Sequence, residues 1–232
     1  MIDLPRICSL GDDCVTVDFG NEISIEKNAK AIALAARLNE NRFTGFIEAV
    51  PAYSSVSVFF DLAQVRRSAE QSETAITDVS RYINAALQNP SNNTRSDERT
   101  VEIEVDFSNE AALDLDRVAE FARISGADVI ELFISRTYSV YMLGFLPGFA
   151  YMGEVDERIA IPRRETPRTS VPKGSVGIAG RQTGIYPFQS PGGWQIIGRT
   201  SSDMFSLDRE PNSLLRPGDE VRFVHGRNGG EK

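Results

Sequence analysis

The chain has 232 residues and a formal net charge of −8, with 41% hydrophobic and 25% charged residues. This composition is typical of a globular protein with one large or two small domains, and the acidic balance argues against a general nucleic-acid binder. The sequence shows no apolar run near the length of a membrane span and no signal-peptide pattern, so we expect a cytoplasmic protein that binds neither nucleic acid nor membrane.

Two cysteines, Cys8 and Cys14, lie near the N-terminus, and the single histidine, His225, lies far from them in sequence. A cytoplasmic protein keeps such thiols reduced, so we expect two buried free cysteines. The set is too small for a zinc site, and the spacing supports no Cys-His catalytic pair. We therefore expect no metal.

Residues 1–92 predict an α+β domain, an α/β sandwich. Strands are expected on both sides of Gly11–Asp12, and Ser24 begins a helical period over residues 24–42. Residues 46–61 predict a strand, a proline-marked turn and a second strand, and residues 74–88 a second amphipathic helix. The apolar face of that helix holds Ile76, Val79, Tyr82, Ile83, Ala86 and Leu87. This order predicts two helices packed on an antiparallel sheet.

A polar, proline-containing segment follows, and it predicts a linker over residues 93–99 that leads into a second domain, residues 100–232. Residues 100–107 alternate strictly and predict a half-buried strand. We expect helices over residues 113–124 and 126–133, with Asp114 and Asp116 in the first turn of the former, where the helix dipole favours acids. Further strands are expected over residues 137–143 and after a turn at Pro217–Gly218.

Residues 144–200 carry many glycines and prolines between short apolar runs, so no helix can pass through them. The pattern predicts short strands joined by tight loops, as in a small barrel or sandwich. The same stretch holds seven cations and one acid, Glu165, between Arg158 and Arg199. The cations are Arg158, Arg163, Arg164, Arg168, Lys173, Arg181 and Arg199.

Two interpretations of this basic stretch stay open. Arginine presents a planar fork that suits carboxylate, phosphate or carboxamide groups, which favours a loop-lined site for a small anionic or amide ligand. The alternative is a solvated basic face. Gln182 and Thr183 place an amide and a hydroxyl either at a loop mouth or in a polar turn, and Trp194 is either a core anchor or a pocket wall.

The residues by themselves identify no catalytic set. The sequence contains no GxxxxGK[ST] phosphate loop, and its serines have no histidine nearby that would complete a hydrolase triad. The catalytic residues are therefore unknown at this level, and no cofactor can be assigned to the chain.

One long motif carries a family resemblance. The run GFLPGFAYMG from Gly144, continued from Ile161 as IPRRETPRTSVPKGSVGIAGRQTGIYPFQSPGGWQIIGRT, closely resembles the family that comprises allophanate hydrolase subunit 1, the B subunit of 5-oxoprolinase and the Kip-type kinase inhibitors. The resemblance extends to residues 9–13, 48–56, 113–119 and 215–223. It implies an α+β N-terminal domain followed by a cyclophilin-like β-barrel domain.

The resemblance also implies an activity and partners. Family members pair with a homologous cyclophilin-like protein, the C subunit, and together with an A subunit they hydrolyse the lactam 5-oxoproline to glutamate at the expense of ATP, which is used by the complex. Alternatives within the family are a non-catalytic inhibitor of a sensor histidine kinase and a component associated with urea amidolyase or allophanate hydrolase. The implied substrate is small and is an anion or a lactam.

The family motif suggests which residues would form the site. The residues expected to bind substrate are Arg163, Arg164, Arg168, Gln182, Thr183 and Arg199. Those expected to shape its loops are Gly144, Pro147, Gly148, Phe149, Pro191, Gly192 and Gly193. In one position this chain departs from similar sequences, which usually carry histidine where Phe133 stands. Phenylalanine can neither donate nor accept a proton, so any acid-base role of that histidine would be missing here.

Overall fold

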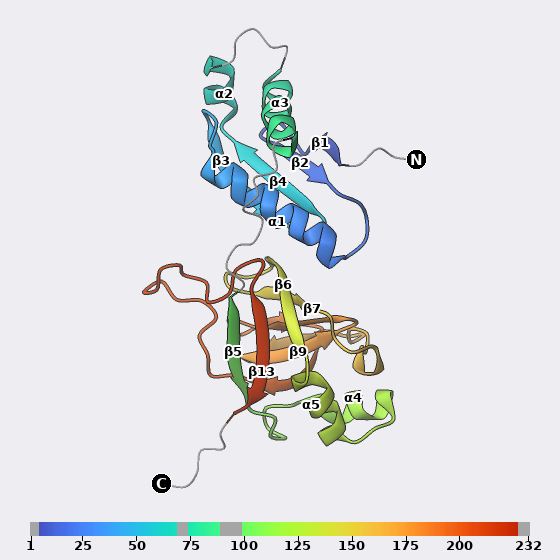
Figure 1. Ribbon diagram of the computed structural model, residues 1–232. Helices are drawn as coiled ribbons and strands as arrows, with labels where there is room; N and C mark the ends of the chain where they lie inside the picture. Colours follow the sequence, from blue (N-terminus) through green and yellow to red (C-terminus); the bar gives the residue numbers. More distant parts are fainter. Residues whose placement is uncertain (1–4, 69–73, 89–98, 227–232) are drawn as a thin grey trace. The chain divides into compact units, whose positions relative to one another are not determined.

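The computed structural model describes residues 5–68, 74–88 and 99–226 (Figure 1). The chain divides into two compact units, residues 1–97 and 98–232. The predicted linker, residues 93–99, lies outside the described residues except for Arg99. No helix within the described ranges is long and apolar enough to cross a membrane.

The first unit contains a four-stranded antiparallel sheet in the order β1-β2-β4-β3. Its strands are β1 (Arg6–Ser9), β2 (Cys14–Asp18), β3 (Phe46–Pro51) and β4 (Ser55–Phe60). The predicted strands on both sides of Gly11–Asp12 and the pair around Pro51 are confirmed. Alternating valines of β2 and β4 point to one face of the sheet, where they are fully buried.

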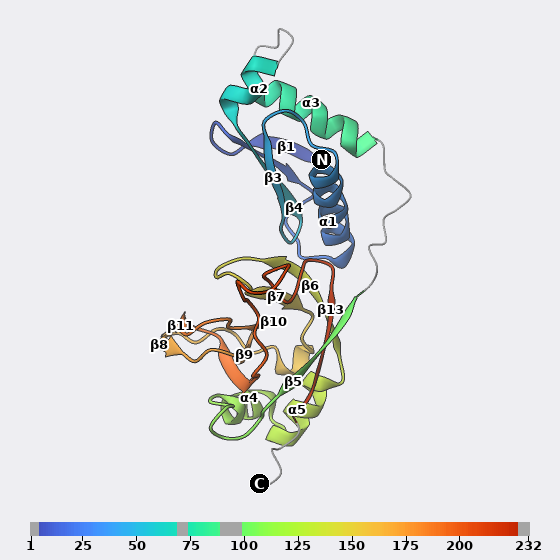
Figure 2. The same cartoon turned by 90° about the vertical axis from the view of Figure 1, so that its left-hand side faces the viewer.

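Three helices complete this unit: α1 (Ile25–Glu40), α2 (Leu62–Ser68) and α3 (Ala75–Gln88). Ser24 caps α1 as predicted, since its hydroxyl accepts a hydrogen bond from the Lys27 amide at 3.5 Å. Leucines of α1 and Val79 and Ile83 of α3 share one core with the sheet valines. Figure 2 shows both helices beside the strands of this sheet. Tyr82, which we placed on the apolar face of α3, is 47% exposed, and α2 was not predicted.

The two cysteines are free. Cys14 is buried, as expected, but Cys8 is only half-buried because β1 is an edge strand of the sheet.

The second unit is built on a seven-stranded sheet in the order β12-β9-β10-β7-β6-β13-β5, in which only β13 and β5 pair in parallel. Its strands are β5 (Thr100–Val105), β6 (Thr137–Leu143), β7 (Ala150–Gly153), β9 (Ser175–Ala179), β10 (Gln182–Ile185), β12 (Gln195–Arg199) and β13 (Glu220–His225). The two edges meet where Asp106 and Arg199 exchange backbone hydrogen bonds of 2.7 and 2.9 Å. The sheet is therefore a nearly closed barrel.

The barrel interior is filled by an apolar core that the helices α4 (Leu115–Ala122) and α5 (Gly126–Ile134) help to cover. Both helices lie together at one end of the barrel (Figure 1). A short 3₁₀ helix, η1 (Glu157–Ile159), packs near α4. The predicted helices are confirmed, although α4 begins at Leu115 instead of residue 113.

A second, smaller core lies on another face of the same strands, beneath a two-stranded ribbon of β8 (Arg168–Val171) and β11 (Ser190–Gly192). It consists of Phe149, Val171, Ala179, Tyr186, Trp194 and Ile196. Because residues 144–200 supply both this core and the ribbon, the predicted short strands of that stretch are confirmed. Trp194 is a core residue.

Candidate functional site

Three buried aspartates organise the arginines of the second unit. Asp114, Asp156 and Asp219 are each at most 5% exposed, and each binds two arginine side chains. Asp156 accepts hydrogen bonds from Arg158 and Arg136, and Asp219 accepts them from Arg99 and Arg216. A buried carboxylate is costly unless it is paired and hydrogen-bonded, so these pairs belong to the fold.

The Asp114 carboxylate holds the centre of the basic stretch. Arg168 donates to both of its oxygens, at 2.8 and 2.7 Å, and Arg164 donates to Oδ1 at 2.8 Å. The backbone amide of Ile196 donates to Oδ2 at 2.7 Å. Four hydrogen bonds thus fix the segment 164–168 to β12 and to the start of α4. We call Asp114, Arg164 and Arg168 the aspartate clamp.

The clamp changes the interpretation of three residues. We expected Asp114 in the first turn of the helix, where the helix dipole stabilises an acid. It is instead the N-cap residue of α4, and its side chain makes no capping hydrogen bond. The sequence does not separate Asp114 from exposed Asp116, because only the tertiary fold turns one carboxylate inward. Arg164 and Arg168, expected to bind substrate, both bind Asp114, whose single negative charge balances one of the two.

Most other cations of residues 158–199 also have partners. Arg158 pairs with Asp156, Arg181 with Glu154, and Lys173 with Asp203 at 2.5 Å. Arg199 helps to close the barrel through its backbone, and its guanidinium donates to the Glu110 carbonyl at 3.4 Å.

Arg163 is different. Among the described residues its side chain has no hydrogen bond and no ion pair; its guanidinium carbon lies 5.8 Å from the centre of the Trp194 ring. Arg163 is exposed, whereas Trp194 is buried beneath it. An aromatic face attracts a guanidinium and leaves its N–H groups free to bind a ligand. This is the position in the stretch where a cation is open to an anion.

The rings around Trp194 form a continuous aromatic wall. Phe149 lies 5.5 Å from Trp194 and 5.4 Å from Tyr186, between ring centres, and Tyr151 lies 5.9 Å from Trp194. Burial raises the pKa of Tyr186, while its hydrogen bond with the Trp194 backbone and the nearby charges of Arg163 and Arg168 act in the opposite direction. Tyr186 therefore stays a neutral phenol at physiological pH, within electrostatic reach of both arginines.

The glycines of the motif make room for these rings. A Cβ on Gly192 would collide with the Tyr186 side chain, and one on Gly184 would lie 2.9 Å from the Phe149 ring. Gly193 lies on the neighbouring Pro167, and Pro191 is exposed in the ribbon.

The loop from Gly144 to Phe149 closes on itself, because the Gly144 amide donates to the Phe149 carbonyl at 3.1 Å. Gly148 has φ +81°, and a Cβ there would lie 2.8 Å from the Met204 carbonyl oxygen. Pro147 is exposed, and Phe145 has φ +68°, a left-handed conformation that costs a non-glycine residue on the order of 1 kcal/mol. In this loop the Phe145 ring is exposed to solvent, whereas the Phe149 ring is buried.

Gln182 and Thr183 lie in β10. The Thr183 hydroxyl is fully buried and donates to the Gly177 carbonyl at 2.9 Å, so it joins two strands and does not open to a loop mouth. Gln182 is half-buried and pairs through its backbone with Gly153 and Ala179. The Thr183 side chain makes no contact with Arg163 among the described residues.

Phe133 lies in the barrel core. It is fully buried, stacks on Phe223 with 4.8 Å between ring centres, and lies 5.2 Å from Tyr138. Its carbonyl accepts a hydrogen bond from the Tyr138 hydroxyl at 2.7 Å. A side chain at this position packs the barrel core, whereas Trp194 belongs to the smaller core, so the replacement bears on packing.

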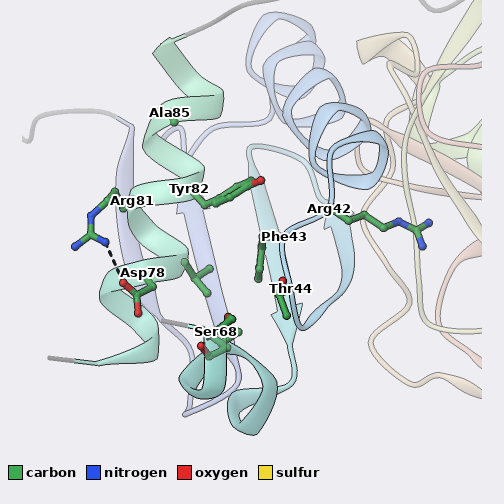
Figure 3. Close-up of a pocket in the computed structure, with 10 residues that line it drawn as sticks. Arg42, Phe43, Thr44, Ser68, Asp78, Arg81, Tyr82 and Ala85 are labelled. Atoms are coloured by element: carbon green, nitrogen blue, oxygen red, sulfur yellow. Dashed lines mark hydrogen bonds and ion pairs between the residues drawn. The ribbon is translucent and has the colours of Figure 1, made fainter. Parts of the chain in front are cut away.

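The first unit contains a hollow of about 570 Å³ between α2, α3 and the chain before β3 (Figure 3). Phe43 and Tyr82 form its aromatic wall, with 5.2 Å between their ring centres. The Arg81 side chain turns away to Asp78, at 3.0 Å (Figure 3). The sequence predicted no ligand-binding residue in this hollow. In the described part of the chain, no three His, Cys, Asp or Glu residues could hold a metal ion together.

Comparisons with known proteins agree with the family resemblance that the long motif carries. Residues 5–215 match the model of the carboxyltransferase domain, subdomain C and D. The chain is 42% identical to the B subunit of 5-oxoprolinase from Bacillus subtilis over 94% of its own length and 92% of that protein. It is 36% identical to the corresponding 5-oxoprolinase B subunit of Escherichia coli O157:H7, over 97% of both chains.

A solved structure shares the fold. The crystal structure of TTHA0988 superposes with a TM-score of 0.80 at 34% identity, and the match covers 94% of this chain but 41% of that one. This chain thus spans about two-fifths of TTHA0988, whereas it spans nearly all of the two curated relatives. The protein belongs to the family of the carboxyltransferase domain, subdomain C and D, with the 5-oxoprolinase B subunits among its relatives.

Proposed function

We propose that this protein is the B subunit of an ATP-dependent 5-oxoprolinase, which hydrolyses 5-oxoproline to glutamate together with an A subunit and a homologous, cyclophilin-like C subunit. The observation that carries the proposal is its identity of 42% to such a B subunit over nearly the full length of both chains. As a component of a hydrolase, the chain would be active only in the complex.

Within that complex, the part of this chain is to bind the substrate carboxylate at Arg163. 5-Oxoproline has one carboxylate, and a guanidinium fork binds a carboxylate through two parallel hydrogen bonds. Arg163 has its N–H groups free for this, and the buried Trp194 ring supports its guanidinium from below. The aspartate clamp supports the site by fixing the segment that follows Arg163.

ATP is assigned to another component of the complex. A phosphate chain needs several free donors at one place, either backbone amides of a glycine-rich loop or unpaired cations. Of the seven cations in residues 158–199, all but Arg163 are bound to protein groups among the described residues. These residues do not fit a nucleoside triphosphate, so we assign no part of ATP binding or hydrolysis to this chain.

The test is glutamate release from 5-oxoproline and ATP by this chain co-purified with the A and C subunits. We expect activity that disappears when the chain is left out. Arg163→Gln should lower kcat/KM about ten- to hundredfold, since a hydrogen bond to a charged group contributes about 1.5–3 kcal/mol. Arg163→Lys should fall between, because lysine keeps the charge and loses the fork.

Arg181→Gln is the matched control, because Arg181 belongs to the same stretch but is an exposed partner of Glu154. It should leave kcat/KM unchanged. Activity that does not depend on the chain would overturn the proposed function. Full activity of Arg163→Gln in a chain-dependent complex would leave the function standing and remove Arg163 from the substrate site.

A further inference from the structure

Three loops at one part of the barrel surface expose large apolar side chains. Phe145 is 60% exposed on the loop 144–149, Phe188 is 38% exposed on the loop after β10, and Leu207 is 83% exposed on the loop 203–213. Leu207 is the most exposed large hydrophobic residue among those the structure describes. Isolated exposed apolar residues are ordinary, but a contiguous group of them marks a binding surface.

Contacts join the three loops into one surface. Phe188 and Phe205 pack edge to face with 6.0 Å between ring centres. Gly148 lies against Phe205, since a Cβ on this glycine would be 2.8 Å from the Phe205 Cβ. Phe145 contacts the Tyr186 ring at 6.5 Å, two residues before Phe188. We call Phe145, Phe188, Phe205 and Leu207 the aromatic-leucine surface.

The loop that carries Leu207 is held in place from within. The Arg209 guanidinium donates to the carbonyls of Asp203, Met204 and Asn212 at 3.0, 3.3 and 2.8 Å. The Asn212 side chain donates to the Ser206 carbonyl at 3.0 Å, and the Ser206 amide donates to the Asn212 carbonyl at 2.9 Å. This loop projects from the barrel in Figure 1. An ordered loop with an apolar tip in solvent is pre-organised for a partner.

The charges around the surface indicate what kind of partner it fits. The segments 144–149 and 186–191 contain no charged residue. At the tip, exposed Asp208 and Glu210 flank Arg209, whose donors are engaged with carbonyls; neither acid forms an ion pair within the described residues. The surface is therefore apolar at its centre and acidic at one rim, and its complement is an apolar depression with a basic rim.

We propose that the aromatic-leucine surface docks the companion barrel protein of the oxoprolinase, the C subunit, and that Leu207 inserts into an apolar depression with a basic rim on that partner. This inference rests on the proposed function. Ring contacts support it, since they run from Phe145 through Phe149 to Trp194 and so connect the surface with the Arg163 site. A partner docked here would rest on the same aromatic core that supports Arg163.

The experiment measures binding of the purified C subunit to the full chain by calorimetry. Leu207→Asp and Phe188→Asp should each weaken binding by about tenfold or more, because anchors at the centre of an interface dominate its affinity. Ile25→Asp, an exposed apolar residue of α1, and Phe121→Asp, an exposed one of α4, are matched controls and should bind like wild type.

The acidic rim gives a second, independent readout. Asp208→Asn combined with Glu210→Gln should weaken binding a few-fold at low salt and flatten its dependence on ionic strength, because rim charges act mainly through screened long-range attraction. The unfolding curves of Leu207→Asp and of the rim variant should match wild type, since those side chains are exposed, whereas Phe188→Asp also loses the ring contact with Phe205.

Three results would overturn the inference. Wild-type binding by Leu207→Asp and Phe188→Asp would place the C subunit elsewhere, while the enzyme assay still supported the function. Self-association of the wild type that Leu207→Asp abolishes would assign the surface to a second copy of this chain. No binding of the C subunit, together with no chain-dependent glutamate release, would remove both the docking surface and the proposed function.

Discussion

Arg163 and Arg164 are neighbours in the chain, yet their guanidinium groups have different partners. Arg164 joins Arg168 on the buried carboxylate of Asp114, where backbone and side-chain donors meet. Arg163 lies over Trp194 with its donors open. An excess of cations in a sequence therefore locates a ligand site poorly, because acids and carbonyls of the protein itself bind most of them.

The strongest effect should appear when the clamp loses its charge. Asp114→Asn leaves two partly buried arginines without a counter-ion, and breaking a buried ion pair costs about 3–5 kcal/mol. We expect a loss of this size in the free energy of unfolding measured with urea. Asp116→Asn on the same helix is the control and should stay within about 0.5 kcal/mol of wild type. Equal curves for both would mean that the clamp does not support the fold.

A smaller effect should separate the two arginine regions directly. Arg168→Gln removes two hydrogen bonds to Asp114 but leaves those from Arg164 and the Ile196 amide in place. We therefore expect a loss of about 1.5–3 kcal/mol in the free energy of unfolding, the contribution of about one hydrogen bond to a charged group. Arg163→Gln should change it by less than about 0.5 kcal/mol, since Arg163 is exposed and its side chain binds no acid among the described residues. The contrast between the two arginines is lost if Arg163→Gln destabilises the protein as much as Arg168→Gln does.

Phe133 tests whether a position committed to the core has any part in the chemistry. Phe133→His puts a polar ring among Phe223 and Tyr138, and burying it without a partner should cost about 1–3 kcal/mol. In the assembled enzyme we expect kcat to be unchanged. A rise in kcat would show that the imidazole takes part in the reaction although residue 133 lies in the barrel core.

The smallest expected effect is on the stability of the protein at low pH. The guanidinium groups of Arg158 and Arg136 hold the pKa of the Asp156 carboxyl far below its usual range. A carboxyl whose pKa is lowered by folding stabilises the protein above the pKa of the unfolded chain, about 3.9, and this contribution is lost as pH falls below it. The free energy of unfolding should thus fall from about pH 5 toward pH 2, and less steeply in Asp156→Asn. Parallel slopes would contradict the assignment.

Much of the fold follows from local patterns. Ser24 caps α1 because its hydroxyl can reach the amide of Lys27, and the alternation of residues 100–105 forms β5 because one side of that strand is buried. The glycines and prolines of residues 144–200 exclude helices and fit strands and tight loops. The helix α2 escaped prediction because seven residues give too little periodicity to recognise.

Local residue order thus accounts for most of the elements, for the basic motif and, through that motif, for the family. Which cations remain open is a property of the tertiary structure, because Asp114 lies about fifty residues before Arg164 and Arg168 in the chain and meets them only when β12 and α4 come together. The same holds for Thr183 and Phe133, which the fold places in the interior. Residue type and spacing describe local chemistry, whereas the pairing of buried charges depends on contacts between distant segments.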